Sequence, residues 1–88
     1  MDSYSKIFGK FFKRKRQERD LSQEKAARLL HMSQTKYSKI ETGNIEIDLD
    51  ILFLFSEFYE CDPADVIRHI YRLSRTSNGF ECVTKKRG

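Results

Sequence analysis

The stretch Leu21–Asn44, LSQEKAARLLHMSQTKYSKIETGN, decides the fold of this chain of 88 residues. It predicts two short helices joined by a turn, because Ser22 and Ser33 each precede a helical run. A serine hydroxyl can accept a hydrogen bond from the free N–H groups that open a helix. Gly43 follows the second run and supplies the left-handed residue that commonly ends a helix. The stretch therefore contains two helix starts and one helix stop, with His31–Met32 between the helices.

Two helices at this spacing are typical of a helix-turn-helix, whose second helix lies in the major groove of DNA. Small and apolar residues occupy the positions that would join the two helices: Ala26, Ala27, Leu30, Tyr37 and Ile40. The open face of the second helix is left with hydrogen-bond donors and no acid: Gln34, Thr35, Lys36, Ser38 and Lys39. Such groups suit base edges, since Gln can grip adenine and Lys can donate to guanine. A hairpin of two solvated helices that binds nothing would have the same spacing.

A family resemblance supports the first interpretation. It is carried by Leu21-Ser22-Gln23-Glu24, Ala27, Leu30, Ser33 and Ile40-Glu41-x-Gly43. These residues resemble the lambda-repressor-like, or XRE-type, helix-turn-helix family. The resemblance extends from Phe8-Gly9 to about Ile67 and implies an all-α DNA-binding fold. We expect a domain of five helices at residues 6–74, with the helix-turn-helix unit at about 22–43, an extended C-terminal helix and a short tail. The sequence departs from the family at His31, where a Gly is usual, and His tolerates the left-handed region better than most residues do.

The resemblance also implies roles for single residues. The family pairs an Arg at position 16 with the Glu at position 41, which predicts a partly buried salt bridge between Arg16 and Glu41. Gln23, at the start of the first helix of the unit, should contact a DNA phosphate as its family counterpart does. We expect base-edge contacts from four residues of the second helix: Gln34, Thr35, Ser38 and Lys39. Further backbone contacts are expected from Lys36, Thr42 and Asn44.

The charge of the chain is unevenly distributed. The net charge is +4, but residues 1–20 carry +4, residues 21–44 carry +2, residues 45–65 carry −7 and residues 66–88 carry +5. Phosphates would attract the basic blocks, which are the proposed reading unit and the two ends of the chain. The acidic block is therefore expected to face away from DNA.

Several function classes find no support in the sequence. Cys61 and Cys82 stand far apart without metal-ligand spacing, so we expect free thiols, no metal and no cofactor. No nucleophile–base pair, carboxylate pair or phosphate-binding loop suggests an enzyme. The longest apolar run, residues 51–55, is far too short to cross a bilayer, and no signal-peptide core is present. The sequence therefore predicts a cytoplasmic, globular protein without a membrane partner.

The fourth helix, LDILFLFSEFY after the cap Asp48, is apolar nearly all round. The helical period predicts that one side faces the core: Leu49, Leu52, Phe53, Ser56 and Tyr59. A helix of this kind is buried on more than one face. We therefore expect a subunit interface made by Ile51, Leu54, Phe55, Phe58, Ile70 and Tyr71. A thick core under the C-terminal segment is the alternative.

The two ends of the chain lead to separate expectations. Residues 1–5 should be a frayed start, and Asp62-Pro63 opens a fifth helix with the apolar stripe Val66, Ile67, Ile70 and Leu73. The tail, residues 75–88, could be a disordered arm, a short strand or a segment swapped onto a partner. The predicted function is that of a homodimeric repressor that reads a palindromic operator in double-stranded DNA. The alternatives are an antitoxin or another regulator controlled by a partner protein, and an interaction module that no longer binds DNA.

Overall fold

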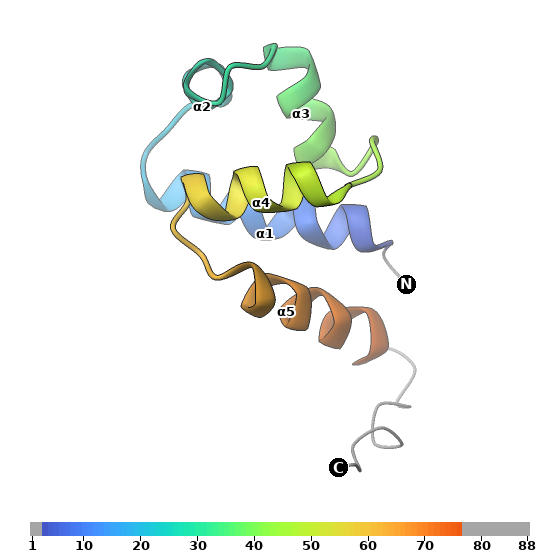
Figure 1. Ribbon diagram of the computed structural model, residues 1–88. Helices are drawn as coiled ribbons and strands as arrows, with labels where there is room; N and C mark the ends of the chain where they lie inside the picture. The colour runs from blue at the N-terminus through green and yellow to red at the C-terminus, as the bar shows by residue number, and fades with distance from the viewer. Residues whose placement is uncertain (1–2, 77–88) are drawn as a thin grey trace.

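The computed structural model describes residues 3–76, and within them the chain forms helices joined by short connections. The five helices are α1 (Tyr4–Glu18), α2 (Gln23–Leu29), α3 (Gln34–Thr42), α4 (Leu49–Phe58) and α5 (Pro63–Thr76). In Figure 1, α4 lies over α1, with α2 and α3 on one side of this pair and α5 on the other. The predicted all-α, five-helix fold is confirmed. The described part of the chain contains no helix long and apolar enough to cross a membrane.

Four of the helices begin at a capping side chain. The side-chain oxygen accepts a hydrogen bond from the backbone N–H three residues later at Ser3, Ser22, Ser33 and Asp48. These bonds satisfy N–H groups that have no partner within the helix. Gly43 has φ 80° and ends α3 in the left-handed region. His31 takes the same region at φ 60°, as do Asp20 and Glu60, so the turn between α2 and α3 forms without a glycine.

The core is built mainly from aromatic rings contributed by α1, α3 and α4. Phe55 of α4 is fully buried, and its ring centroid lies 5.5 Å from those of Phe8 and Phe12 and 5.4 Å from that of Tyr37. Tyr59 closes the group, with its ring centroid 5.5 Å from that of Phe12. Aromatic pairs at these separations are worth about 0.5–1.5 kcal/mol beyond the area that they bury. The cluster therefore holds α1, α3 and α4 against one another.

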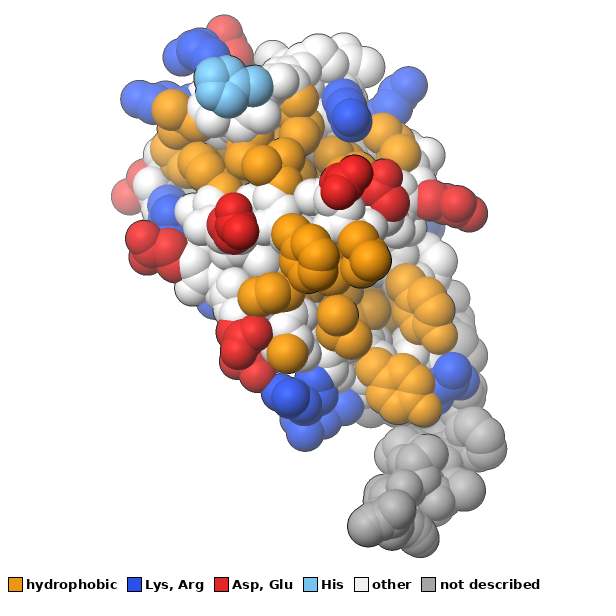
Figure 2. All heavy atoms as spheres, viewed as in Figure 1, with side chains coloured by type: hydrophobic (Ala, Val, Ile, Leu, Met, Phe, Trp, Pro, Cys, Tyr) orange, Lys and Arg blue, Asp and Glu red, His pale blue; other side chains and the backbone are white. Residues whose placement is uncertain are grey.

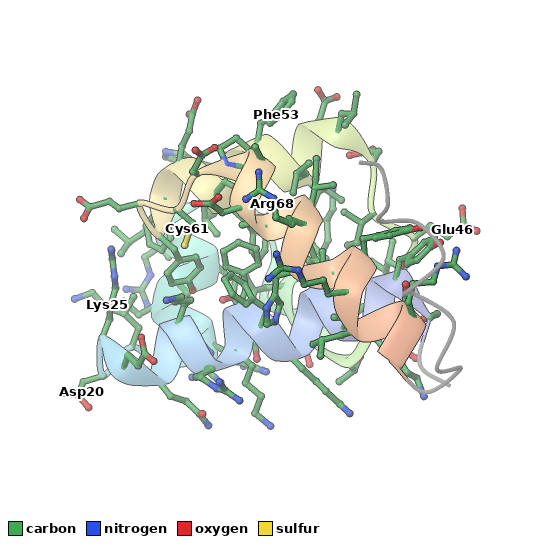
Figure 3. All side chains as sticks on the ribbon, turned by 90° about the horizontal axis from the view of Figure 1, so that it is seen from below. Asp20, Lys25, Glu46, Phe53, Cys61 and Arg68 are labelled. Atoms are coloured by element: carbon green, nitrogen blue, oxygen red, sulfur yellow. The ribbon has the colours of Figure 1, made fainter. Side chains whose placement is uncertain are left out.

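The orientation of α4 differs from the expectation in two ways. Ile51 and Phe55, expected at a subunit interface, lie in the core of the single chain and are 8% and 0% exposed. Conversely, Leu49 and Phe53, expected in the core, are 63% and 45% exposed. Figure 3 shows Phe53 pointing outward, on the side of α4 away from α1. The physical reason is that Phe55, not Phe53, packs against the rings of the neighbouring helices.

The helix α5 keeps only part of its predicted stripe in the core. Val66 is buried and Ile70 half-buried, whereas Ile67 and Leu73 are about half exposed. Helix α1 begins at Tyr4, inside the stretch expected to be frayed, and α5 continues to Thr76. The tail interpretations concern residues that, from position 77 onward, lie outside the described residues.

Candidate nucleic-acid interface

The helix α3 is held against α1 by an approach that only glycine permits. A Cβ added to Gly9, in the middle of α1, would lie 2.6 Å from the carbonyl oxygen of Ile40 and would also collide with that of Glu41. At the end of α3, a Cβ added to Gly43 would lie 2.8 Å from the Cα of Lys6. Backbone therefore packs on backbone at two points. This contact fixes the position of α3 and leaves its opposite side free.

A buried polar network ties the same helices together. The Nε and Nη2 of Arg16 donate to the two carboxylate oxygens of Glu41 at 2.7 and 3.2 Å. The Nη1 of Arg16 donates to the carbonyl oxygen of Leu21 at 2.7 Å, and the side-chain amide of Gln23 donates to Glu41 at 2.9 Å. The hydrogen bond to Glu41 raises the pKa of Arg16 above its ordinary value. The salt bridge implied by the resemblance is thus present. Gln23, the first residue of α2, joins the same network through its hydrogen bond to Glu41.

A second polar contact supports α3 from the core side. The hydroxyl groups of Tyr37 and Tyr59 share a hydrogen bond of 2.5 Å between two buried side chains. Burial raises the pKa of both phenols above the ordinary value, and for Tyr37 the hydrogen bond to Tyr59 adds to the shift. Both groups therefore stay neutral well above physiological pH. The bond joins α3 to the end of α4 and satisfies two hydroxyls that would otherwise be buried alone.

The outward side of α3 carries the residues that were predicted to meet base edges. Four of them line one shallow depression on the surface: Gln34, Thr35, Ser38 and Lys39. All but Ser38 are exposed, and Ser38 is half-buried. The first turn of α3 contains no acid. The arrangement offers amide, hydroxyl and ammonium groups on one ridge, and hydrogen-bond donors of these kinds can read base edges in a major groove.

The residues predicted to contact the DNA backbone occupy different surroundings. Lys36 and Asn44 are exposed at the two ends of α3. The hydroxyl of Thr42 donates back to the carbonyl oxygens of Ser38 and Lys39, at 3.0 and 3.2 Å. Gln23 is half-buried and held by Glu41. One N–H of its amide is used in this bond, and the second N–H remains to donate elsewhere.

The acidic block and the basic residues of α1 occupy different parts of the surface. The face seen in Figure 2, which carries α4, shows acidic side chains among exposed apolar groups. Several of these apolar groups line a groove between α4, α5 and the start of α1: Tyr4, Ile47, Leu49, Ile67 and Tyr71. In Figure 3, nitrogen-tipped side chains project from the edge of α1 that lies away from α4. The acidic block and the basic helix α1 thus expose their charges on different sides of the molecule.

Sequence reasoning missed three features of this site. The bond between Gln23 and Glu41, the pair of Tyr37 and Tyr59, and the close contact at Gly9 were not predicted. A signal existed for the last of these, because a glycine inside a helical pattern is unfavourable and often marks a close approach of another backbone.

Comparison with known proteins agrees with this geometry. A family model described as helix-turn-helix matches residues 12–66, more than half of the chain. No curated protein matches the sequence significantly. Two crystal structures of the clp gene regulator ClgR from Corynebacterium glutamicum have similar folds. One has a TM-score of 0.71 at 17% identity and covers 81% of this chain and 92% of its own. The other has a TM-score of 0.74 at 15% identity and covers 96% and 89%.

The structural neighbours establish the shared fold, and the family model covers all of α2, α3 and α4 together with the C-terminal part of α1. The ion pair of Arg16 with Glu41 and the glycine that ends α3 accord with this assignment. The chain belongs to the lambda-repressor-like, XRE-type family of helix-turn-helix proteins, a family of DNA-binding regulators.

Proposed function

We propose that this protein is a sequence-specific transcriptional repressor that binds double-stranded DNA with the N-terminal part of α3 in the major groove. The observation that carries the proposal is the acid-free ridge of Gln34, Thr35, Ser38 and Lys39 on a helix whose other side is fixed. A recognition helix must be rigid, because base contacts need positions accurate to a fraction of an ångström. The network around Glu41 supplies that rigidity.

The contacts divide into two kinds under this proposal. The ridge residues read base edges, whereas Lys36, Thr42, Asn44 and Gln23 hold the phosphate backbone and set the register. Gln23 has a particular place in this scheme, because its amide is already oriented by Glu41. The residue that locks α1 to α3 would then also aim a phosphate contact.

A pair of variants separates the two kinds of contact. Gln34→Ala should cost about 1–3 kcal/mol on the preferred operator and relax the preference at one base pair. Lys36→Ala should weaken binding to every sequence and lower the slope of log affinity against log salt by about one unit. Affinity for operator and for random duplex would be measured by fluorescence anisotropy. If both variants lose the same affinity on both duplexes, the assignment of base readers is wrong.

We propose further that the protein acts as a homodimer. Large apolar side chains of α4 and α5 remain exposed, among them Leu54 and Tyr71, with Phe58 and Ile70 half-buried beside them. Exposed apolar groups that gather on one face are typical of interaction sites.

A two-fold dimer would present two α3 helices about 34 Å apart, so the operator should be an imperfect palindrome. Tyr71→Glu should yield monomers in sedimentation velocity and reduce operator affinity sharply. The exposed variant Glu46→Gln serves as a control and should stay dimeric. A wild-type chain that sediments as a monomer at micromolar concentration would contradict the dimer.

The apolar groove also favours a second candidate, a regulator controlled by a partner protein. The groove lies on the opposite side of the α1–α4 pair from the ridge of α3, so a partner bound there would leave the ridge open. Co-purification of a second protein in a fixed ratio, lost in Tyr71→Glu, would support this candidate. A pure homodimer in the same preparation would argue against it.

A further inference from the structure

The basic side of α1 carries two lysines that none of the DNA contacts proposed above uses. Lys6, Gly9, Lys13 and Arg16 recur at intervals of three and four residues, so they lie on one side of the helix. Two members of this set touch α3 directly: Gly9 meets the backbone at Glu41, and Arg16 pairs with its carboxylate. Lys6 abuts Gly43 at the end of α3.

Lys13 stands between Gly9 and Arg16 on this side and yet is exposed, as is Lys6. Neither ammonium group forms an ion pair with a carboxylate of residues 3–76. Both side chains therefore leave α1 next to the last turn of α3 and extend into water there. The geometry puts two uncompensated cations beside the end of α3, at Thr42 and Gly43.

The position of Lys6 adds an independent argument. It lies in the first turn of α1, which contains no acid. The positive end of a helix dipole favours acidic side chains and disfavours cations. A lysine at this place therefore works against the stability of its own helix, and such breaks of a local rule are expected where a residue serves binding.

We infer that Lys6 and Lys13 form a phosphate-binding edge on α1, which contacts the DNA backbone flanking the base pairs read by α3. The inference rests on the proposed function and extends it. Each ammonium would neutralise one phosphate and release its condensed counterion. The duplex would then be held on both sides of Glu41. The side-chain amide of Gln23 would hold it at the start of α2, and Lys13 would hold it at this edge of α1.

The test is the salt dependence of binding to a random-sequence duplex, measured by fluorescence anisotropy between 50 and 200 mM NaCl. The double variant Lys6→Gln/Lys13→Gln should lower the slope of log affinity against log salt by about 1.8 per protomer. For each bound protomer, the variant should therefore lose about 12-fold less affinity over that range than the wild type loses. Glutamine keeps the Cβ and Cγ of lysine, so the packing of position 6 against Gly43 is retained.

A charge-matched control is available on α5, which lies across the α1–α4 pair from α3 (Figure 1). Arg68→Gln/Arg72→Gln removes the same two charges from exposed positions and should leave the slope unchanged. Sedimentation velocity would verify that each variant keeps the wild-type oligomeric state. Thermal unfolding should show the α1 variant to be at least as stable as the wild type.

The outcomes are distinct. A wild-type slope in the α1 variant would overturn the inference while leaving the proposed function standing. Equal changes in the α1 and α5 variants would also overturn it, because the effect would then come from net charge alone. A wild-type protein that does not bind duplex at 50 mM NaCl would overturn the proposed function and this inference with it.

Discussion

Replacing Glu41 by Gln tests the network that fixes the reading helix. The change keeps the shape of the side chain and removes its charge. Glu41 accepts three hydrogen bonds, two from Arg16 and one from Gln23, and its side chain is 1% exposed. A glutamine can offer only one carbonyl oxygen to these donors, and its amide would face the guanidinium with N–H groups of its own.

The magnitude follows from the burial of the pair. The side chain of Arg16 is 11% exposed, so its charge would be left without a counter-ion in a largely desolvated place. Breaking a buried pair in this way costs about 3–5 kcal/mol. A domain of this length has a total stability of about 4–13 kcal/mol. With about 4–8 °C for each kcal/mol, the melting temperature should fall by roughly 12–40 °C.

Urea denaturation followed by circular dichroism would measure the effect. The variants Arg16→Gln, Glu41→Gln and the double variant close a thermodynamic cycle. The double variant should be less destabilised than the sum of the two single variants, because the two positions share one interaction. Glu46→Gln, at an exposed position, should stay within about 0.5 kcal/mol of the wild type. Unchanged stability in Glu41→Gln, or additive losses in the cycle, would refute the structural role of the network.

Three further predictions concern the folded state. Gly9→Ala should cost about 1–3 kcal/mol in chemical denaturation, although Ala is the better helix former by about 1 kcal/mol, because its methyl group would strike the backbone at Glu41; a stabilised variant would contradict the close packing. Ser56→Ala should leave stability unchanged or raise it by about 1 kcal/mol, because the buried hydroxyl has no partner among the described residues; a clear loss would reveal a bond not accounted for. Burial raises the pKa of Tyr37 and Tyr59, so their contribution to stability is complete below the ordinary value of about 10 and is lost as pH rises above it, by about 1.4 kcal/mol per pH unit for each group. Urea titrations between pH 9 and 11.5 should show this fall in the free energy of unfolding, and the fall should be less steep in Tyr59→Phe. An identical dependence on pH in that variant would argue against the hydrogen-bonded pair.

The local features of the fold could be predicted from the sequence because they depend on neighbouring residues. The helix starts at Ser22 and Ser33 follow from a hydroxyl group and an N–H group three residues later. The stop at Gly43 follows from the left-handed backbone conformation that glycine adopts readily. The resemblance supplied the pair of Arg16 and Glu41, which are 25 positions apart and could not be joined by any local rule.

The rotation of α4 could not be predicted in the same way. A helix with apolar residues nearly all round has no single stripe, so its pattern does not say which side faces the core. The answer depends on rings supplied from elsewhere in the chain, by Phe8, Phe12 and Tyr37, which pack against Phe55 and leave Phe53 outside. Two of the expected interface residues belong to the core for this reason. The exposed apolar surface instead includes Leu49 and Phe53.

The candidate site was predictable at the level of residue types and not of their surroundings. The ridge of α3 follows from helical spacing once α3 is placed, because the apolar residues Tyr37 and Ile40 define the opposite side. The half-buried state of Gln23 follows from the position of Glu41 on another helix. Contacts of that kind depend on how the helices cross.

Selection of bound sequences from a random duplex pool, with the wild-type protein and with Gln34→Ala in parallel, would show whether α3 reads DNA. The wild-type protein should enrich a motif with inverted symmetry, whose half-sites are centred about one helical turn apart, or a multiple of that distance. The variant Gln34→Ala should lose the preference at one position in each half-site. A pool in which the wild-type protein enriches no motif would contradict the proposal that α3 reads DNA. The same holds if the motif is unchanged in each of the variants Gln34→Ala, Thr35→Ala and Lys39→Ala.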